Sequence, residues 1–289
     1  MSVPTFRFAP SPNGNLHLGH AYSALLNARM AEQAGGRFLL RIEDIDPERC
    51  TPDHERGILD DLAWLGLRWE QPVRRQSEHF DDYAEALQRL IAEDLVYPAF
   101  MSRSEVRTWL TEEAPPDWPR DPDGVPHYPP RDRRMGMRER EARLSRGDGH
   151  SWRLDVEAAL ARLGGRPHWN ETGRGPAGET GRIVGDPAAW GDVVIARKDV
   201  PASYNLCVVV DDAIQGVTDV VRGRDLYNAT AVHRLLQDLL GLPVPTYHHH
   251  DLILGDDGRK LSKSRGDTAL RALRLAGSTP ADIAGAIGL

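Results

Sequence analysis

The opening segment of the chain alternates between extended and helical patterns, and this order restricts the fold more than any other feature. Phe6 to Ala9 is a short apolar run typical of a buried strand, and residues 10–14 (PSPNG) are rich in turn-forming residues. Residues 18–30 have the spacing of a helix, and a second strand is predicted over 38–42. A strand, a loop, a helix and another strand in this order indicate an α/β sheet.

Apolar residues at helical spacing continue in the next two segments, which predicts two amphipathic helices. The residues are Ile58, Leu62 and Leu65 in one segment, and Tyr83, Leu87, Leu90 and Ile91 in the other. Between residues 96 and 190 this regularity is lost, and the chain becomes rich in Pro, Gly, Arg and Trp. We interpret that region as an insertion made of shorter elements.

Regular patterns return after the insertion. Strands are predicted over 193–197, 208–210 and 217–222, followed by a helix around 232–239. Two half-sheets on either side of an insertion predict a doubly wound, Rossmann-type parallel sheet that binds its ligand at the topological switch point. The predicted parts are 1–95 (first half of the sheet domain), 96–190 (inserted subdomain), 191–254 (second half) and 255–289 (a loop and a short helical tail).

Composition argues against a membrane or secreted protein. The longest aliphatic stretch, Leu206 to Val210, is far shorter than the ~20 residues that cross a bilayer, and the N-terminus lacks the features of a secretory signal. Cys50 and Cys207 are far apart and outside any CxxC spacing, so neither a disulfide framework nor a thiolate zinc site is predicted. We expect a cytoplasmic protein that is a monomer.

The formal net charge of -7 argues against a uniformly basic nucleic-acid binder, but it allows one local basic surface. Such a surface is a candidate where seven arginines crowd together, at Arg131, Arg133, Arg134, Arg138, Arg140, Arg143 and Arg146. The alternative is an exposed helix on which Asp132, Glu139 and Glu141 pair with these arginines. The sequence leaves both interpretations open.

The sequence His17-Leu18-Gly19-His20 lies where the first predicted loop meets the first helix. Both imidazoles and the free backbone N–H groups there face the positive end of the helix dipole, which favours a polyphosphate. Gly19 has no Cβ and lets a base or ribose approach, while the histidines donate to phosphate oxygens. Taken alone, the same histidines are also explained as simple helix caps.

A second motif, Lys260-Leu261-Ser262-Lys263-Ser264, follows the turn-forming residues 255–258. Two lysines on a loop that can close over phosphates indicate a mobile cationic flap. An ordinary basic surface loop would explain the pentad if it occurred alone. The two motifs together, in this order, are much more specific than either one.

The two motifs resemble the HIGH and KMSKS signatures of the class I aminoacyl-tRNA synthetases, and several segments between them resemble the glutamate branch of that class. These segments are Arg7 to Pro12, Arg41 to Asp46, Tyr204-Asn205 and Val221 to Gly223. The resemblance covers nearly the whole chain and implies a Rossmann-type catalytic core with an inserted acceptor-end-like subdomain. It implies a glutamate site made by Arg7, Phe8, Ala9, Pro10, Ser11, Glu43, Tyr204 and Arg222.

The charges of three of these residues agree with a glutamate ligand. An arginine fork binds a carboxylate through two hydrogen bonds, and a carboxylate binds the ammonium group. Arg7 and Arg222 supply the cations and Glu43 supplies the anion. Considered singly, these residues have structural explanations: a surface charge for Arg7, an ion pair with Asp225 for Arg222, and a structural ion network for Glu43.

The resemblance also implies ATP as the second substrate. Its predicted binding residues are His17, Gly19, His20, Lys260, Ser262 and Lys263. We assign His17, His20, Lys260 and Lys263 to stabilisation of the charge that develops in the transition state, because an ionised carboxylate needs no general base to attack the α-phosphorus. Mg²⁺ is expected to bind chiefly through the phosphates.

Only 25 residues follow Ser264, fewer than the ~50 that an anticodon-reading domain needs. The chain therefore resembles those paralogues of the glutamate branch that esterify glutamate onto queuosine in the anticodon of tRNA(Asp). This acceptor rests on the resemblance alone. The alternatives are a truncated glutamyl-tRNA synthetase that charges a tRNA 3′ end, a non-catalytic tRNA-binding paralogue, or another nucleotidyltransferase that acts on a small acid.

One departure from the family concerns zinc. Relatives often hold zinc in the insertion through Cys-x-Cys and Tyr-x3-Cys, whereas this chain has Ala99, Met101, Tyr128 and Asp132 at those positions. We therefore predict no structural zinc, and we expect packing or arginine pairing to hold the insertion. Residues 248–250 (HHH) are predicted to lie in a strand, where alternate side chains point to opposite faces and do not converge on one metal ion.

Overall fold

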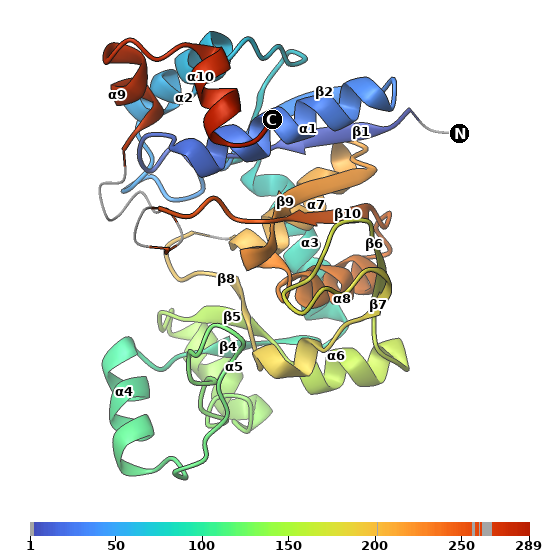
Figure 1. Ribbon diagram of the computed structural model, residues 1–289. Coiled ribbons are helices and arrows are strands. Elements are labelled where there is room, and N and C mark those ends of the chain that lie inside the picture. The colour runs from blue at the N-terminus through green and yellow to red at the C-terminus, as the bar shows by residue number, and fades with distance from the viewer. Residues whose placement is uncertain (1–2, 201, 256–257, 260, 262–267) are drawn as a thin grey trace.

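The computed structural model describes residues 3–200, 202–255, 258–259, 261 and 268–289. In these ranges a seven-stranded sheet forms the centre of the molecule, with strand order β3-β2-β1-β9-β10-β6-β7 (Figure 1). Its neighbouring strands pair in parallel, except for the antiparallel pair β6 and β7. The strands are β1 (Thr5–Phe8), β2 (Arg37–Ile42), β3 (Arg74–Arg75), β6 (His168–Glu171), β7 (Gly181–Val184), β9 (Asp219–Gly223) and β10 (Thr246–His250).

The alternation of side chains along the strands gives the sheet two different faces. On one face, Phe6 and Phe8 of β1 pack with buried residues of helix α1 (Leu18–Gln33). On the other face, Arg7 of β1 and Arg41 of β2 reach Asp212 of helix α7 (Tyr204–Ile214). One face is therefore apolar beneath α1, and the opposite face carries buried charge beneath α7.

The apolar face extends beyond α1 into a second helical layer. Helix α2 (Pro52–Trp64) contributes Ile58 and Leu62 to the core beside α1. The C-terminal helices α9 (Leu270–Leu275) and α10 (Pro280–Ala286) close this core with Leu270 and Ile283. The helical tail therefore packs against the sheet domain, at the top of the molecule in Figure 1.

The charged face is covered by helices α3 (Phe80–Ala92), α7 and α8 (Thr230–Leu240), which share the largest apolar cluster with a smaller sheet. That sheet has the order β4-β5-β8 with antiparallel pairing. Its strands are β4 (Val96–Ala99), β5 (Ser151–Leu154) and β8 (Val194–Ala196), and helix α6 (Val156–Leu163) packs beside it. The smaller sheet lies below β1, β9 and β10 in Figure 1.

The remaining helices are short. Helices α4 (Arg103–Glu112) and α5 (Met137–Ser145) bury no residue, and Figure 1 shows α4 at the edge of the molecule, far from the main sheet. Single 3₁₀ turns occupy η1 (Gln76–Glu78), η2 (Pro187–Trp190) and η3 (Arg224–Leu226). None of the described helices is long and apolar enough to span a bilayer.

Most predicted elements are present, but the strand predicted over 208–210 is wrong. Val208, Val209 and Val210 lie inside helix α7, which begins after Ser203, whose side chain accepts a hydrogen bond from the backbone N–H of Leu206. The helix is buried on every side between Leu206 and Asp212, so its apolar residues show no helical period. A short continuous apolar run does not distinguish a buried helix from a buried strand.

The division of the chain at residues 96 and 190 stays a prediction. The strand pairing differs from it in two places: β6 and β7 join the main sheet, whereas β8 joins the smaller sheet. Both placements depend on pairing between segments far apart in the chain, such as Tyr247 of β10 with Glu171 of β6. Local sequence patterns carry no information about such pairing.

Candidate active site

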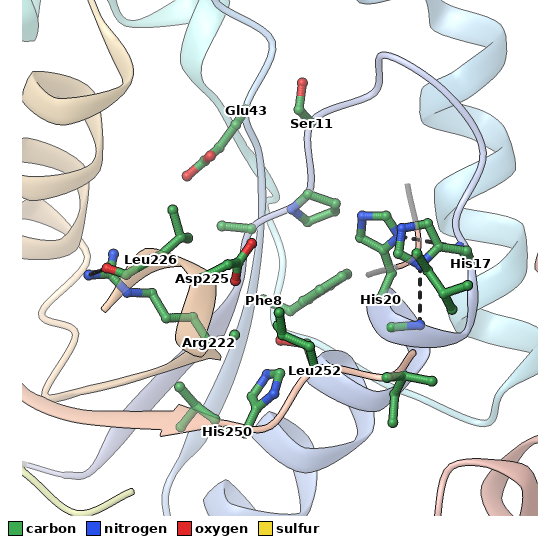
Figure 2. A pocket seen from close by; sticks show the side chains of 18 of the residues that line it. Phe8, Ser11, His17, His20, Glu43, Arg222, Asp225, Leu226, His250 and Leu252 are labelled. Atoms are coloured by element: carbon green, nitrogen blue, oxygen red, sulfur yellow. Dashed lines mark hydrogen bonds between the residues drawn. The ribbon is translucent and has the colours of Figure 1, made fainter. Parts of the chain in front are cut away.

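A pocket of about 630 Å³ opens at the C-terminal ends of β1 and β9, next to the first turn of α1 (Figure 2). Strand β1 lies between β2 and β9, so this is the switch point of the sheet. The lining includes every predicted glutamate-binding residue, namely Arg7, Phe8, Ala9, Pro10, Ser11, Glu43, Tyr204 and Arg222. It also includes His17, Gly19 and His20, whereas Lys260, Ser262 and Lys263 lie outside the described residues.

The two histidines cap helix α1, as the simpler interpretation of the motif predicts. The His17 ring accepts a hydrogen bond from the backbone N–H of Gly19, and His20 Nδ1 accepts one from the backbone N–H of His17. A Cβ on Gly19 would lie 3.1 Å from the His17 ring, so glycine gives this ring room. Since both rings also line the pocket, capping fixes them at the helix N-terminus, where an anion is favoured.

A network of buried charges lies behind the pocket. The Asp212 carboxylate accepts hydrogen bonds from Arg7 Nε at 3.0 Å and from Arg41 Nη1 at 2.8 Å. Arg41 is fully buried and also contacts Glu43 at 3.3 Å and Asp211 at 3.7 Å. Burial alone would raise the pKa of the Asp212 carboxyl, but the two guanidinium groups outweigh burial and lower it. Arg7 and Arg41 therefore have anionic partners within the protein.

Glu43 lines the pocket at the outer end of this network. Burial raises the pKa of its carboxyl, and the neighbouring Arg41 and Arg7 offset that rise only in part. A cationic ligand group beside Glu43 would stabilise the carboxylate form, as an ammonium group does. Tyr204, the first residue of α7, lies in the same pocket, and burial raises the pKa of its hydroxyl, so it stays protonated at neutral pH.

Arg222 has a different environment, although it is also buried, with 6% of its surface exposed. Its Nε donates to His249, its Nη1 to His233, and its Nη2 to Thr230 and to the Leu226 carbonyl, at distances between 2.7 and 3.2 Å. All of these partners are neutral acceptors. Within the described ranges no carboxylate forms an ion pair with Arg222, so the predicted alternative of an Arg222–Asp225 pair is not observed.

The histidines beside Arg222 are held in the neutral form. Burial lowers the pKa of His233 well below its usual range, and Arg222 acts in the same direction. Burial also lowers the pKa of His249 to about 4, against the raising effect of its hydrogen bond to Glu171. The guanidinium of Arg222 is consequently a buried cation whose contacts are uncharged, and such a charge favours a ligand carboxylate.

Several residues of this site were not predicted from the sequence, among them Arg41, Glu171, Asp211, Asp212, His233 and His249. A signal existed for His249, because strand alternation places it on the opposite face from His248 and His250. Indeed His249 faces Arg222, whereas His248 contacts Thr172 and His250 packs against Tyr22 of α1. The predicted strand for 248–250 is confirmed.

The resemblance implies zinc ligands at the positions of Ala99, Met101, Tyr128 and Asp132, and the last three of these residues are joined by hydrogen bonds. Asp132 is fully buried, and its Oδ2 accepts hydrogen bonds from the backbone N–H groups of Phe100 (2.6 Å) and Met101 (3.1 Å) and from the Tyr128 hydroxyl. Arg153 stacks on the Tyr128 ring at 3.9 Å. Among the described residues, no group of three or more His, Cys, Asp or Glu side chains is arranged to hold a metal ion.

The arginine cluster is partly paired, with partners other than those expected. Arg133 contacts Asp155, Glu157 and Asp192, Arg140 contacts Asp94, and Arg143 and Arg146 both contact Asp148. Asp132 instead binds the backbone, as described above. The other members, Arg131, Arg134 and Arg138, are exposed and form no ion pair within the described part of the chain.

Comparison with known proteins agrees with this geometry. Residues 3–283 match the family model described as tRNA synthetases class I (E and Q), catalytic domain. A Glutamyl-Q tRNA(Asp) synthetase of Rhodobacter capsulatus is 46% identical over 287 residues, which cover 98% of this chain and 99% of that protein. A protein of the same name from Symbiobacterium thermophilum is 40% identical, with 96% of this chain and 84% of that protein covered.

Longer relatives match over part of their length. A Glutamate--tRNA ligase of Prochlorococcus marinus is 38% identical, with 94% of this chain but 55% of that protein covered. A crystal structure of a glutamate tRNA ligase from Elizabethkingia meningosepticum, in complex with its amino acid, superimposes with a TM-score of 0.74 at 28% identity. That match covers 92% of this chain and 53% of the solved chain, so this chain spans about half the length of that structure.

Proposed function

The chain belongs to the family of class I tRNA synthetase catalytic domains for E and Q, and we propose that it activates L-glutamate with ATP and transfers it to queuosine in the anticodon of tRNA(Asp). The observation that carries the choice of amino acid is Arg222, a buried cation held by neutral groups in the pocket. Glutamate brings the side-chain carboxylate that such a cation favours, whereas glutamine brings a neutral amide.

The other pocket residues support the same ligand. Glu43 lines the pocket as a buried carboxylate and is assigned to the ammonium group of glutamate. Arg7, Ser11 and Tyr204 line the same pocket and are assigned to the carboxylates, and Phe8, Ala9 and Pro10 form the wall of the pocket beside them. ATP is assigned to the N-terminus of α1, where His17, Gly19 and His20 lie.

The reaction follows from these positions in two steps. In the first step a glutamate α-carboxylate oxygen bonds to the α-phosphorus of ATP, the bond to the bridging oxygen breaks, and pyrophosphate leaves. In the second step a queuosine hydroxyl attacks the acyl carbon, AMP leaves, and the hydroxyl proton is lost to solvent or to AMP. When bound with ATP, Mg²⁺ would neutralise part of the charge on the phosphates. His17, His20, Lys260 and Lys263 are assigned to stabilising the negative charge that develops around the α-phosphorus in the transition state.

The acceptor is assigned by similarity. The two relatives quoted with 46% and 40% identity are both named for glutamyl-Q tRNA(Asp) synthesis, and this chain matches most of the length of each. The relative named for glutamate–tRNA ligation matches over 55% of its length. Queuosine-bearing tRNA(Asp) is therefore preferred over a tRNA 3′ end. The proposed location is the cytoplasm, where ATP, glutamate and tRNA occur together.

The first experiment is ATP–pyrophosphate exchange with each amino acid, without and with RNA. Exchange with glutamate alone is expected. The second is transfer of labelled glutamate to tRNA(Asp) with and without queuosine, before and after periodate oxidation of the 3′-terminal ribose under conditions that spare the queuosine. Queuosine-dependent labelling supports the proposal. Labelling that needs an intact 3′ ribose would favour a truncated ligase, and no exchange would favour a non-catalytic tRNA-binding protein.

A further inference from the structure

We infer that Glu171, His249 and His233 are positioning residues that set the amino-acid specificity, because they hold Arg222 through neutral acceptors and leave its charge for the side-chain carboxylate of the substrate. This inference rests on the proposed function. None of the three residues lies in the segments on which the resemblance to the synthetases rests, such as residues 41–46 and 221–223. They come from strand β6, strand β10 and helix α8, and they meet at Arg222 on the charged face of the main sheet.

The sheet places His249 directly beside Arg222. Strands β9 and β10 pair in parallel with Arg222 opposite His249, so their side chains lie on the same face. The Nε of Arg222 is 3.1 Å from Nε2 of His249. Because an arginine Nε always carries a hydrogen, His249 Nε2 must be the acceptor.

Glu171 fixes the ring of His249 in the required tautomer. Its Oε2 lies 2.6 Å from His249 Nδ1 and 3.2 Å from Trp169 Nε1, and its Oε1 accepts from the backbone N–H groups of His249 and Gly173 at 2.8 and 3.0 Å. The indole N–H of Trp169 and the two backbone N–H groups can only donate, so Glu171 is an acceptor as the carboxylate, and the hydrogen of the His249 ring is therefore on Nδ1. That leaves the lone pair of Nε2 for Arg222.

A glycine allows this close approach of β6 and β10. A Cβ on Gly173 would lie 2.2 Å from the backbone oxygen of His249 and 2.7 Å from its nitrogen. A side chain at residue 173 would therefore separate the two strands. The contact between Glu171 and His249 depends on backbone as well as on side-chain geometry.

His233 binds the other side of Arg222 in the same way, with one ring nitrogen as the acceptor and the other as the donor. Its Nδ1 is 3.1 Å from Arg222 Nη1 and must accept, while its Nε2 is 3.1 Å from Asn205 Oδ1 and donates. The Thr230 hydroxyl oxygen is a third acceptor, 2.7 Å from Arg222 Nη2. Arg222 is therefore fixed in one orientation, and each of these side chains that contact it is uncharged.

The neutrality of these acceptors distinguishes Arg222 from its neighbours. Arg7 and Arg41 lie on the same sheet face, but both are bound by the Asp212 carboxylate. A carboxylate at residue 233 would neutralise the charge of Arg222, as Asp212 neutralises the charges of Arg7 and Arg41. The pocket would then lose its preference for a charged side chain over the corresponding amide.

Two variants of His233, with glutamine or glutamate in its place, have side chains of the same size and differ in charge. Comparing them separates the effect of charge beside Arg222 from the effect of side-chain shape. In His233→Gln the amide oxygen accepts from Arg222 and the amide nitrogen donates to Asn205, so both hydrogen bonds are kept. In His233→Glu one carboxylate oxygen accepts from Arg222 and the Asn205 amide turns to donate to the other. Calorimetric titration with L-glutamate and L-glutamine, together with pyrophosphate exchange, measures their effect. Circular dichroism and thermal unfolding check that both variants are folded.

We expect His233→Gln to bind glutamate within about threefold of the wild type and His233→Glu to bind it at least about 30-fold more weakly. Binding of glutamine and the KM for ATP should change less than about threefold in both. Equal glutamate affinities in the two variants would overturn the inference. Should His233→Glu not fold, Thr230→Asn and Thr230→Asp make the same charge comparison at another partner of Arg222.

A matched control and a separate readout complete the test. His248→Gln changes the adjacent residue of β10, which contacts Thr172 on the other face of the strand, and should leave glutamate binding unchanged. A wild-type protein that binds glutamate without catalysing exchange would refute the proposed reaction, and the variant pair would still decide the inference. A wild-type protein that binds neither amino acid would refute both.

Discussion

At the scale of single residues, Arg7 and Arg222 are the same kind of side chain, but their hydrogen-bond partners differ in charge. Both are buried arginines on one sheet face, but Asp212 binds Arg7, whereas histidine and threonine side chains bind Arg222. The free charge of Arg222 is therefore available to a ligand. We expect the two residues to contribute unequally to the choice between glutamate and glutamine.

Arg222→Ala should raise the KM for glutamate steeply while the KM for ATP stays within about twofold. A charge-assisted contact contributes roughly 1.5–3 kcal/mol, so the expected rise is on the order of 10- to 100-fold. Steady-state pyrophosphate exchange measures both constants. Arg37→Ala removes an arginine whose partner is the exposed Glu70 and should change neither constant. Unchanged glutamate kinetics in Arg222→Ala would contradict the pocket assignment.

The neutral state of His249 predicts how stability depends on pH. The unfolded chain protonates this ring below about pH 6.5, but the folded protein does so only near pH 4. The neutral ring of His249 makes its full contribution to the free energy of unfolding above pH 6.5. That contribution is lost as the pH falls, by up to ~1.4 kcal/mol per pH unit. Urea unfolding at pH 7 and pH 5 should show a smaller loss in His249→Gln than in the wild type. Equal losses would contradict the prediction.

At the scale of elements, Asp132 joins Tyr128 to the backbone that follows β4, at positions where the resemblance implies zinc ligands. Its buried carboxylate accepts from two backbone N–H groups and the Tyr128 hydroxyl. Asp132→Ala leaves these donors without their acceptor and should lower the free energy of unfolding by roughly 2–4 kcal/mol. Asp132→Asn keeps one acceptor oxygen and should cost less. Urea unfolding tests this order, with the exposed Asp123→Ala as control; equal stabilities would count against the role of Asp132.

The arginines before and within α5 offer a test of RNA binding. Arg131, Arg134 and Arg138 are the members that form no ion pair within the described ranges, so they are the ones available to phosphates. Replacing all three with alanine should weaken tRNA binding and lower the slope of log affinity against log salt by about two to three. Glutamate exchange without RNA should be unaffected. Arg162→Ala, which removes an exposed partner of Glu93, is the control. An unchanged slope would favour a merely solvated helix.

At the scale of the whole molecule, metal dependence should separate catalysis from folding. Removal of divalent ions with EDTA should stop pyrophosphate exchange, because Mg²⁺ neutralises the ATP phosphates, and adding Mg²⁺ should restore it. The unfolding midpoint of the ligand-free protein should change by less than about 1 °C. A large fall in that midpoint with EDTA, reversed by zinc, would contradict the predicted absence of a structural zinc site.

The sequence predicted the elements with a clear local pattern. Helices α2, α3 and α8 lie where apolar residues recur at helical spacing, and strands β1, β2 and β9 lie on short apolar or β-branched runs beside turn-forming residues. Helix α7 was missed because it is buried all round, and with it Asp211 and Asp212 were missed as partners of Arg41. Hydrophobic periodicity arises because one side of an element is buried and apolar and the other is exposed and polar. A fully buried element has no exposed side and therefore shows no such period.

The sequence predicted many of the residues that line the candidate site, but it did not predict the buried residues that hold them in position. Many lining residues lie in short motifs that can be identified by resemblance, and the pocket contains those motif residues that were predicted to bind glutamate. Others, such as Leu226, His250 and Leu252, lie outside these motifs. The supports are set by tertiary contacts: Arg7 meets Asp212 from 205 positions away, and His249 meets Glu171 from 78 positions away. Such contacts follow from strand order and from the face on which each side chain lies. A single sequence shows how side chains alternate along one strand, but it shows neither the strand order nor which residues each face meets.

The position of β1 in the sheet has a consequence for the newly made chain. Of the described strands, β1 leaves the ribosome before the others, yet its neighbour on one side, β9, begins only at Asp219. Until β9 is made, the edge of β1 that faces β9 therefore has no partner strand, and such an open edge favours pairing with other nascent chains. This enzyme is consequently expected to depend on chaperones that shield its N-terminal segment until translation has passed β9.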